Sequence, residues 1–503
     1  MQKTVGDKLQ PVKPFDKIWD RIGREAFWLM LGQSLTALAG LVAIRVLTGL
    51  FPKEVYGLSW LFINAVGLGV MLLANPLGQA LNRFYHDGGG QEQLDRLLAL
   101  VWRLQVGVAL VVGLTYVLAV AALGSLRGSH WLVYGIMPVY FFFLAFLNMA
   151  QLLLNTSRRR KGRVILLVTE AWLKPAGAVA ACLLWRPDVN SFVLGYASAS
   201  IITGVAGMLV MKGYGSVSPF KLTMPDREYA GTVIRYSMPW VGVAACIWAL
   251  SLSGRYFVNS FMGAAATGTY VATYQVSAAL FQLLGGSFGT LMVPIIYQQS
   301  AKAKSQGEDV MSNTFRAFAW AGLPVVAVFV VMRVWLMRWL VSPAYWDGVD
   351  AIIWIGLGVY VSIMGDLGAT AFHVAKKTTA MLYIYVASVA VYALLCLTLI
   401  PRIGLVGAGI STFAAYSFYA FWMIYVGRSF RRWVFPLRSF LAAWTILAVT
   451  SVVVSLSHAL LLKGRFGYPY AAATLLIFCA TLGLSAWLFR RSWQRDFKIL
   501  SNF

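Results

Sequence analysis

The positive charges of this 503-residue chain lie on alternate sides of a long series of hydrophobic segments. Fourteen apolar segments of roughly 20 or more residues are each long enough to cross a bilayer as a helix. Of the 42 lysines and arginines, 31 lie in the two tails and the even-numbered connections, and 6 lie in the odd-numbered connections. This alternation follows the positive-inside rule and predicts that both termini are cytoplasmic. The predicted spans are centred near Leu38, Val70, Val111, Phe141, Ala178, Ile201, Ala249, Leu280, Ala327, Gly358, Ser388, Ala414, Thr450 and Thr474.

The composition agrees with an all-α, polytopic membrane protein. Hydrophobic residues make up 59% of the chain and charged residues 12%, more apolar surface than a soluble protein of this length could bury. The net charge of +24 does not indicate a nucleic-acid partner. Most of the excess lies in short cytoplasmic connections such as Arg158–Lys161, where membrane orientation and anionic headgroups account for it.

Several functional classes lack their sequence signatures here. The four cysteines all fall inside predicted spans without a CxxC, and the four histidines are scattered, so we expect no metal and no cofactor. A phosphate-cradling GxxxxGK[ST] is absent from the sequence, which excludes an ATP-driven pump. No connection is long enough to form a catalytic domain, so we do not expect an enzyme.

The spans group into two bundles. We predict a cytoplasmic tail over residues 1–25, a six-helix bundle over 26–212 and a cytoplasmic linker over 213–237. A second six-helix bundle follows over 238–428, then an extra helix pair over 429–489 and a tail over 490–503. An internal repeat supports this division, because Arg45–Gly57 and Arg255–Gly268 each place an arginine near a span end, then a turn and a glycine. An offset of six spans gives the two bundles the same orientation, as in transporters built from parallel repeats.

Four sequence patches carry a family resemblance. They are Arg45–Gly57, the region from Tyr236-Ser-Met-Pro-Trp240 through Gly254-Arg-Tyr-Phe257 to Gly263–Tyr270, Pro343–Gly348, and Pro401–Gly404 with Gly407-Ala-Gly409. In order and spacing these patches resemble the Wzx-type polysaccharide flippases of the multidrug/oligosaccharidyl-lipid/polysaccharide exporter superfamily, over about residues 20 to 430. Two features depart from the family pattern. Gly254 stands where the family often has Asp, and the extra helix pair resembles that of the lipid II flippases.

The resemblance implies a function. It implies alternating-access flipping of an undecaprenyl-diphosphate-linked oligosaccharide across the bacterial inner membrane for polysaccharide export. Membrane lipids, polysaccharide polymerase and export proteins are the implied partners, and H⁺ or Na⁺ the implied coupling ion. Two alternatives remain: a multidrug/ion antiporter of the same superfamily, and a lipid-linked sugar polymerase. Basic residues inside spans argue against a cationic drug, and short outer loops argue against a polymerase.

Polar residues inside the spans are the candidate substrate site, because charges in hydrocarbon usually face a bundle interior or a water-filled cavity. In the second span, Asn75, Gln79 and Asn82 share one helical face with Asn64, and Arg83 lies near that face. This stripe is interpreted either as a cavity wall that binds sugar hydroxyls or as a polar seam between packed helices.

Arg45, Arg83 and Arg255 are the candidate diphosphate ligands, because guanidinium groups donate bidentate hydrogen bonds to phosphate oxygens. For Arg45 and Arg255, snorkelling to lipid headgroups is the alternative.

Two carboxylates are candidates for the coupling ion. Glu170 stands one helical turn from Lys174, which favours an intrahelical ion pair over an ion site. Asp366 has no oppositely charged residue at i±4 and is the second candidate.

Overall fold

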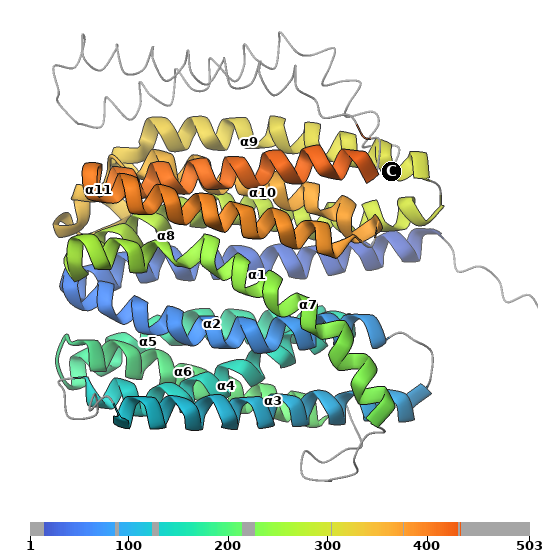
Figure 1. The fold of residues 1–503 in the computed structure, drawn as a ribbon, viewed down its shortest axis with the longest axis horizontal. Helices are drawn as coiled ribbons and strands as arrows, with labels where there is room; N and C mark the ends of the chain where they lie inside the picture. Colours follow the sequence, from blue (N-terminus) through green and yellow to red (C-terminus); the bar gives the residue numbers. More distant parts are fainter. Residues whose placement is uncertain are drawn as a thin grey trace, which may run out of the picture.

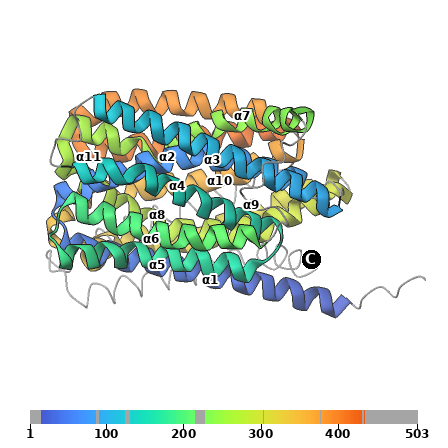
Figure 2. The same cartoon turned by 90° about the horizontal axis from the view of Figure 1, so that it is seen from below.

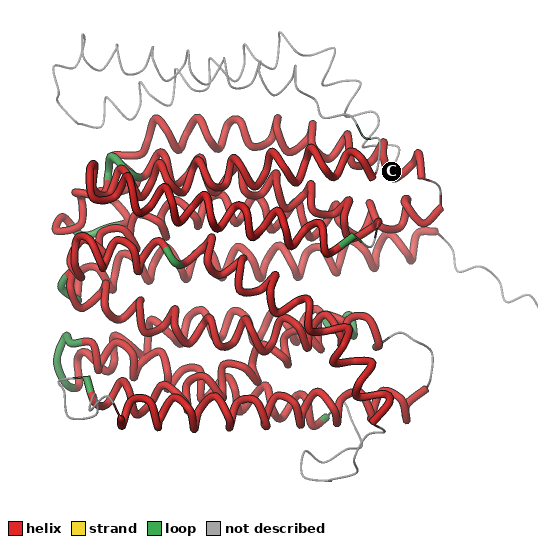
Figure 3. The backbone as a smooth tube through the Cα atoms, in the orientation of Figure 1, coloured by secondary structure: helices red, strands yellow, loops and turns green. Residues whose placement is uncertain are grey.

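The computed structural model describes residues 15–85, 90–122, 130–213, 227–302, 304–375, 377–430 and 433. These residues form long helices that run roughly side by side, and strands are absent from the described ranges (Figures 1 and 3). The first bundle, called the N-terminal bundle below, contains α1 (Phe15–Leu50), α2 (Lys53–Phe84), α3 (Gly90–Ala122), α4 (Trp131–Thr156), α5 (Arg160–Leu184) and α6 (Val189–Lys212). The C-terminal bundle contains α7 (Arg227–Leu252), α8 (Gly254–Lys302), α9 (Lys304–Leu340), the 3₁₀ helix η2 (Pro343–Gly348), α10 (Ile352–Ala375) and α11 (Thr378–Phe430).

Two of these helices contain a sharp reversal. Gly263 has φ 81° in α8, and Gly404 has φ 61° in α11, a region of backbone conformation that favours glycine. At each reversal the helix turns back on itself, as the two antiparallel tracks of α11 show (Figure 1). α8 and α11 therefore each supply helical segments on both sides of a tight turn.

The described part of the chain is a multi-pass membrane protein. It has nine helical segments that are long and apolar enough to cross a membrane, two of which contain the reversals at Gly263 and Gly404. The centres of the first twelve predicted spans all fall within helices. The last two predicted spans, centred near Thr450 and Thr474, and the tail over 490–503 lie outside the described residues. The count of fourteen thus stays a prediction.

The helix bounds can be set against the predicted domain limits. α1 begins at Phe15, inside the segment 1–25 that the sequence predicts as a tail. α7 begins at Arg227, inside the predicted linker 213–237, of which residues 214–226 lie outside the described ranges.

α1 and α7 connect the two bundles. α1 packs on α5 of its own bundle and on α8 of the other, and α7 packs on α2 as well as on α11. In Figure 1, α7 crosses obliquely from the C-terminal bundle toward α2, and Figure 2 shows α1 beside α5. The two bundles also meet where α2 packs on α8 and where α1 packs on α9. The space enclosed by these helices holds the site described below.

The turn before α6 is fixed by a local hydrogen-bond network. Asp188 is the N-cap of α6 and accepts a hydrogen bond from the Ser191 backbone N–H at 2.8 Å, the usual use of Asp at this position. Arg186 pairs with the same carboxylate at 2.9 Å. Burial raises the pKa of Asp188, but hydrogen bonds from Ser191, Asn190 and Arg186 outweigh this effect, so its pKa is lowered.

Candidate functional site

A cavity of about 740 Å³ lies between the two bundles. Its walls are built from α1, α2, α5 and α6 on one side and from α7, α8, α10 and α11 on the other. The lining mixes amides, hydroxyls, aromatic rings and three charged side chains among apolar residues. Its polar and aromatic members are Gln33, Thr36, Trp60, Asn64, Lys174, Tyr196, Ser251, Arg255, Tyr274, Gln275, Gln282, Ser362, Asp366 and Tyr416.

The cavity reaches the middle of the helices. We call the end of the molecule where α1 ends, α2 begins and η2 lies the η2 end. At about 1.5 Å per residue, Arg255 lies about 12 Å from the turn at Gly263, and Asp366 lies about 21 Å from the start of α10 at Ile352. Both charges therefore lie about 12 Å or more from the η2 end, a depth at which a bilayer with a hydrocarbon core of about 30 Å is most hydrophobic.

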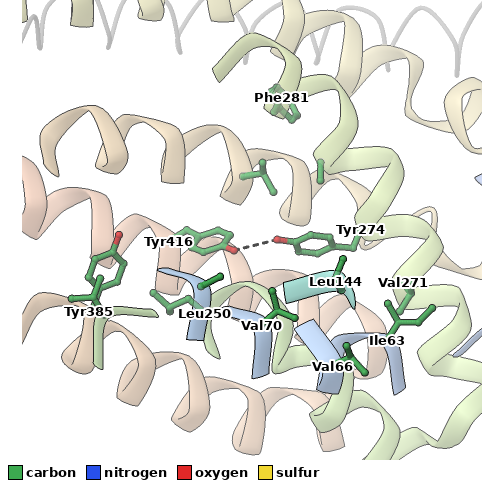
Figure 4. Packing of buried hydrophobic residues seen from close by; sticks show 14 of the residues in the cluster. Ile63, Val66, Val70, Leu144, Leu250, Val271, Tyr274, Phe281, Tyr385 and Tyr416 are labelled. Atoms are coloured by element: carbon green, nitrogen blue, oxygen red, sulfur yellow. Dashed lines mark hydrogen bonds between the residues drawn. The ribbon is translucent and has the colours of Figure 1, made fainter. Parts of the chain in front are cut away.

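Arg255 of α8 is the most buried charged residue of the cavity wall, at 5% exposure. Its Nη1 donates to Oδ1 of Asn64 on α2 at 2.6 Å, so the bond joins the two bundles. Its guanidinium lies 5.8 Å from the Trp60 ring and 5.4 Å from the Tyr274 ring, within cation–π range. Tyr274 in turn points toward Tyr416, with their hydroxyls 3.2 Å apart (Figure 4).

Two donor groups at this arginine are unsatisfied. Arg255 Nε and Asn64 Nδ2 are both buried and find no hydrogen-bond partner among the described residues. Both atoms are N–H donors and cannot accept, so acceptor oxygens are what would satisfy them. Burying such donors without partners costs about 1–3 kcal/mol each, which a bound anion or carbonyl oxygen would recover.

Lys174 and Glu170 form the ion pair that their spacing predicts. Lys174 Nζ donates to Glu170 Oε1 at 2.5 Å, and the two side chains are 19% and 14% exposed. Gln151 of α4 donates to the other carboxylate oxygen at 3.0 Å. Lys174 lines the cavity, whereas Glu170 lies outside the lining. The ion pair that the sequence favours is therefore present, and a role of Glu170 in ion coupling stays a prediction.

Asp366 on α10 has a different environment. It lines the cavity and is exposed to it. Tyr419 of α11 donates to its Oδ1 at 2.7 Å, and the Tyr419 hydroxyl lies 3.0 Å from that of Tyr385. A hydroxyl partner leaves the negative charge of this carboxylate uncompensated, unlike the charge of Glu170.

At the η2 end the bundles are held together by polar contacts. Arg45 Nη1 donates to the Val341 carbonyl at 2.9 Å, and Ser342 N–H donates to Thr48 Oγ1 at 3.1 Å. Tyr345 of η2 is 1% exposed, and its hydroxyl donates to the backbone carbonyl of residue 51 at 2.7 Å. An exposed ion pair joins Lys53 and Asp347 at 2.6 Å.

Two glycines bring α2 and α8 into backbone contact at the same end. A Cβ atom at Gly57 would overlap the Ala264 carbonyl oxygen, and one at Gly268 would overlap the Lys53 carbonyl oxygen. Gly57 and Gly268 are also the two glycines of the sequence repeat, and they lie against each other. The cavity is therefore closed at the η2 end by direct backbone packing.

The structure distributes the predicted site residues unevenly. Arg255 and Asp366 line the cavity. Arg45 lies at the η2 end, and Arg83 is exposed at the opposite end of α2. Asn75 and Gln79 lie on α2 outside the cavity lining. Of the polar stripe predicted on this helix, Asn64 lines the cavity. The side chain of Asn82 lies outside the described residues.

Sequence reasoning missed several lining residues. Trp60 stands one turn from Asn64, and Gln275 and Gln282 stand seven residues apart on α8 among small residues. On α1, Gln33, Thr36 and Gly40 follow the same helical spacing. Polar or aromatic residues spaced three, four or seven apart along these helices were the available signal.

Comparison with known proteins identifies the family. Residues 22–300 match the family model described as polysaccharide biosynthesis protein. The chain belongs to this family. A search of curated proteins gave no match.

Solved structures show the fold. A lipid II flippase MurJ in an inward closed conformation superposes with a TM-score of 0.70 at 12% identity, covering 92% of this chain and 99% of that one. An inward-facing multidrug resistance MATE transporter of the MOP superfamily gives 0.60 at 15% identity, covering 79% and 94%. The outward-facing conformation of such a transporter gives 0.58 at 15% identity, covering 81% and 94%. The chain thus combines membership of the polysaccharide biosynthesis protein family with the fold of these flippase and transporter structures, which agrees with the resemblance that the sequence motifs indicate.

Proposed function

We propose that this protein flips undecaprenyl-diphosphate-linked oligosaccharide repeat units across the bacterial inner membrane by alternating access. The flipped units serve the export of exopolysaccharide, capsule or O-antigen. The headgroup occupies the cavity between the bundles while the lipid tail stays among the membrane lipids. Polysaccharide polymerase and export proteins are the partners that take the flipped unit onward.

The observation that carries this proposal is a buried arginine with unsatisfied donors in a cavity deep between the bundles. Arg255 Nε and Asn64 Nδ2 offer N–H groups to acceptor oxygens, as a diphosphate requires. Around them, Trp60 and Tyr274 present ring faces, and Gln275 presents an amide that pairs with sugar hydroxyls. The family match and the transporter fold support the same substrate class.

Flipping can be measured in proteoliposomes with a fluorescent farnesyl-diphosphate-linked disaccharide. Dithionite quenches only the label in the outer leaflet of the vesicles. We expect vesicles that contain the protein to lose more fluorescence than empty vesicles, because flipping continuously exposes the inner pool. Equal quenching in the two preparations would contradict the proposal.

The proposed orientation places both termini in the cytoplasm and the η2 end outside. The charge alternation supports it, since 31 of the 42 basic residues fall on the proposed cytoplasmic side. Reporter fusions after Arg160 and Lys304 are expected to report the cytoplasm, and fusions near Asp188 and Tyr345 the outer side. A single inverted reporter would refute the orientation.

We assign the coupling ion, H⁺ or Na⁺, to Asp366 in preference to Glu170. Lys174 already compensates Glu170, whereas Asp366 is exposed to the cavity with a tyrosine hydroxyl as partner. An anionic headgroup in the same cavity repels the Asp366 carboxylate unless a cation neutralises it. Cargo binding and cation binding would thereby be linked.

The exposed Asp366 also favours a second candidate function, a multidrug/ion antiporter. A cationic compound would pair with this carboxylate, and the MATE transporter fold accommodates such a role. Arg255 and Lys174 in the same cavity oppose a cationic cargo. Saturable binding of ethidium to the purified protein, without binding of farnesyl diphosphate, would favour the antiporter.

A further inference from the structure

The cavity wall that the N-terminal bundle contributes carries a second cation. Lys174 belongs to α5 of the N-terminal bundle, and Arg255 belongs to α8 of the C-terminal bundle. Lys174 lies ten residues before the end of α5 at Leu184, about 15 Å along the helix, and Arg255 lies about 12 Å from the turn at Gly263. The two cations therefore line one cavity from different bundles, at similar distances along their helices from the η2 end.

The ion pair with Glu170 leaves Lys174 with donors to spare. An ammonium group has three N–H donors and no acceptor. One of them is directed at Glu170 Oε1 at 2.5 Å, and the side chain remains 19% exposed where it lines the cavity. The carboxylate has a second donor in Gln151, at 3.0 Å. Glu170 is thus held on the side of α4, and Lys174 presents its remaining donors to the cavity.

We propose that Lys174 is the second ligand for the diphosphate and sets the preference for a diphosphate over a monophosphate headgroup. Arg255 contacts one phosphoryl group from the C-terminal bundle, and Lys174 contacts the other from the N-terminal bundle. Glu170 and Gln151 are positioning residues that hold the ammonium at the wall. This inference rests on the proposed function, because it assumes a lipid diphosphate in this cavity.

A ligand held by both walls also makes the cavity sensitive to the charge of its contents. A monophosphate carries one phosphoryl group and satisfies one of the two cations. A diphosphate satisfies both, and each charge-assisted hydrogen bond to a partly buried cation adds about tenfold or more in affinity. The preference is therefore built from two residues that no short sequence motif joins.

The test compares binding of farnesyl diphosphate and farnesyl monophosphate to the full chain in lipid nanodiscs by calorimetry. The informative variant is the double substitution Glu170→Gln with Lys174→Met, because it removes both partners of the pair and leaves no unpaired charge. We expect its affinity for the diphosphate to fall about tenfold or more, with the monophosphate affinity nearly unchanged. Lys174→Arg is expected to retain the diphosphate preference, since it keeps the cation.

Lys161→Met is the matched control, since this exposed lysine lies on the same helix, outside the cavity lining. It is expected to bind both lipids as the wild type does. If the double variant folds and keeps the diphosphate preference, the proposed role of Lys174 is overturned. If the wild type binds farnesyl diphosphate and Arg255→Ala abolishes that binding, the proposed function still stands. Wild-type protein that binds neither lipid would overturn both.

Discussion

Arg45 and Arg255 hold corresponding places in the two sequence repeats, yet they lie in different surroundings. Arg45 is exposed, and it donates to the Val341 carbonyl at the η2 end, where the bundles touch. Arg255 is 5% exposed and lies in the cavity, with Asn64 as its partner and two aromatic rings beside it. Both side chains reach across to the opposite bundle. Arg45 helps to close the cavity at the η2 end, whereas Arg255 is placed to contact a molecule bound in the cavity.

The difference shows that the sequence repeat fixes the position of an arginine along its helix but not the groups that its side chain contacts. The Arg45 contact is to a backbone carbonyl, which any donor could use. The Arg255 contact leaves buried N–H donors unsatisfied. Such donors do not stabilise the protein alone, but they can bind the acceptor oxygens of a ligand. We therefore assign cargo binding to Arg255 and bundle closure to Arg45.

The largest expected effect is on the cavity side of this comparison. Arg255→Ala removes the cation and leaves Asn64 Oδ1 without its donor, so we expect flipping to be abolished at normal protein level. Arg255→Lys restores the charge but not the bidentate geometry, and partial activity is expected. Arg45→Ala is the paired measurement and is expected to retain most activity. Equal losses in the Arg45 and Arg255 alanine variants would end the distinction between them.

The next largest effect concerns the backbone contact at the η2 end. Gly57→Ala places a Cβ atom onto the Ala264 carbonyl, so α2 and α8 have to separate. We expect a cysteine placed at Ser59, which is buried in the closed form, to become reactive to a water-soluble maleimide in this variant. Gly49→Ala on α1 is the control, because nothing lies within 4 Å of its added Cβ atom. Equal labelling in the two backgrounds would show that the glycine contact does not hold the bundles.

A subtler effect is expected at Asp366. Asp366→Asn keeps the hydrogen bond from Tyr419 but removes the charge. We expect the variant to bind farnesyl diphosphate at least as tightly as the wild type, because repulsion of the anion is lost. Transport into proteoliposomes is expected to lose its response to an imposed proton or sodium gradient. A variant whose transport still follows the gradient would leave Asp366 without a coupling role.

The smallest effect is expected from the ion pair between Lys53 and Asp347. Its side chains are 23% and 73% exposed, and such pairs contribute under about 1 kcal/mol. A double-mutant cycle on thermal unfolding, with Lys53→Ala, Asp347→Ala and both together, measures this coupling free energy. A coupling well above that range would mean that this pair, rather than the glycine contact, closes the η2 end.

Much of the helical architecture follows from the sequence, because hydropathy and charge alternation act along the chain. The centres of the first twelve predicted spans fall in helices, and the spacing of Glu170 and Lys174 predicts their ion pair. Which residues line the cavity does not follow from the sequence in the same way. Helical periodicity places Asn64 and Asn75 on one face, but only the crossing of α2 with α7 and α8 decides which of them borders the cavity.

Lys174 illustrates the same limit at the level of one side chain. Its partner at i−4 could be predicted, because that spacing is local. Its exposure to the cavity depends on how α5 is rotated between α1 and α6, which is a property of the packed bundle. The meeting of Gly57 with Gly268 is another such case, since the repeat marks both glycines without stating that they touch.

The reversals at Gly263 and Gly404 have a consequence for how the protein is made. Each joins two antiparallel helical segments through a turn of a few residues, without a separate loop. The turn from Asn259 to Ala266 carries no charged residue, and the turn from Pro401 to Leu405 carries one, Arg402. During biosynthesis, such a hairpin can enter the bilayer as a pair, because little polar material has to be carried across with it. The same glycines that shape these turns therefore ease membrane insertion.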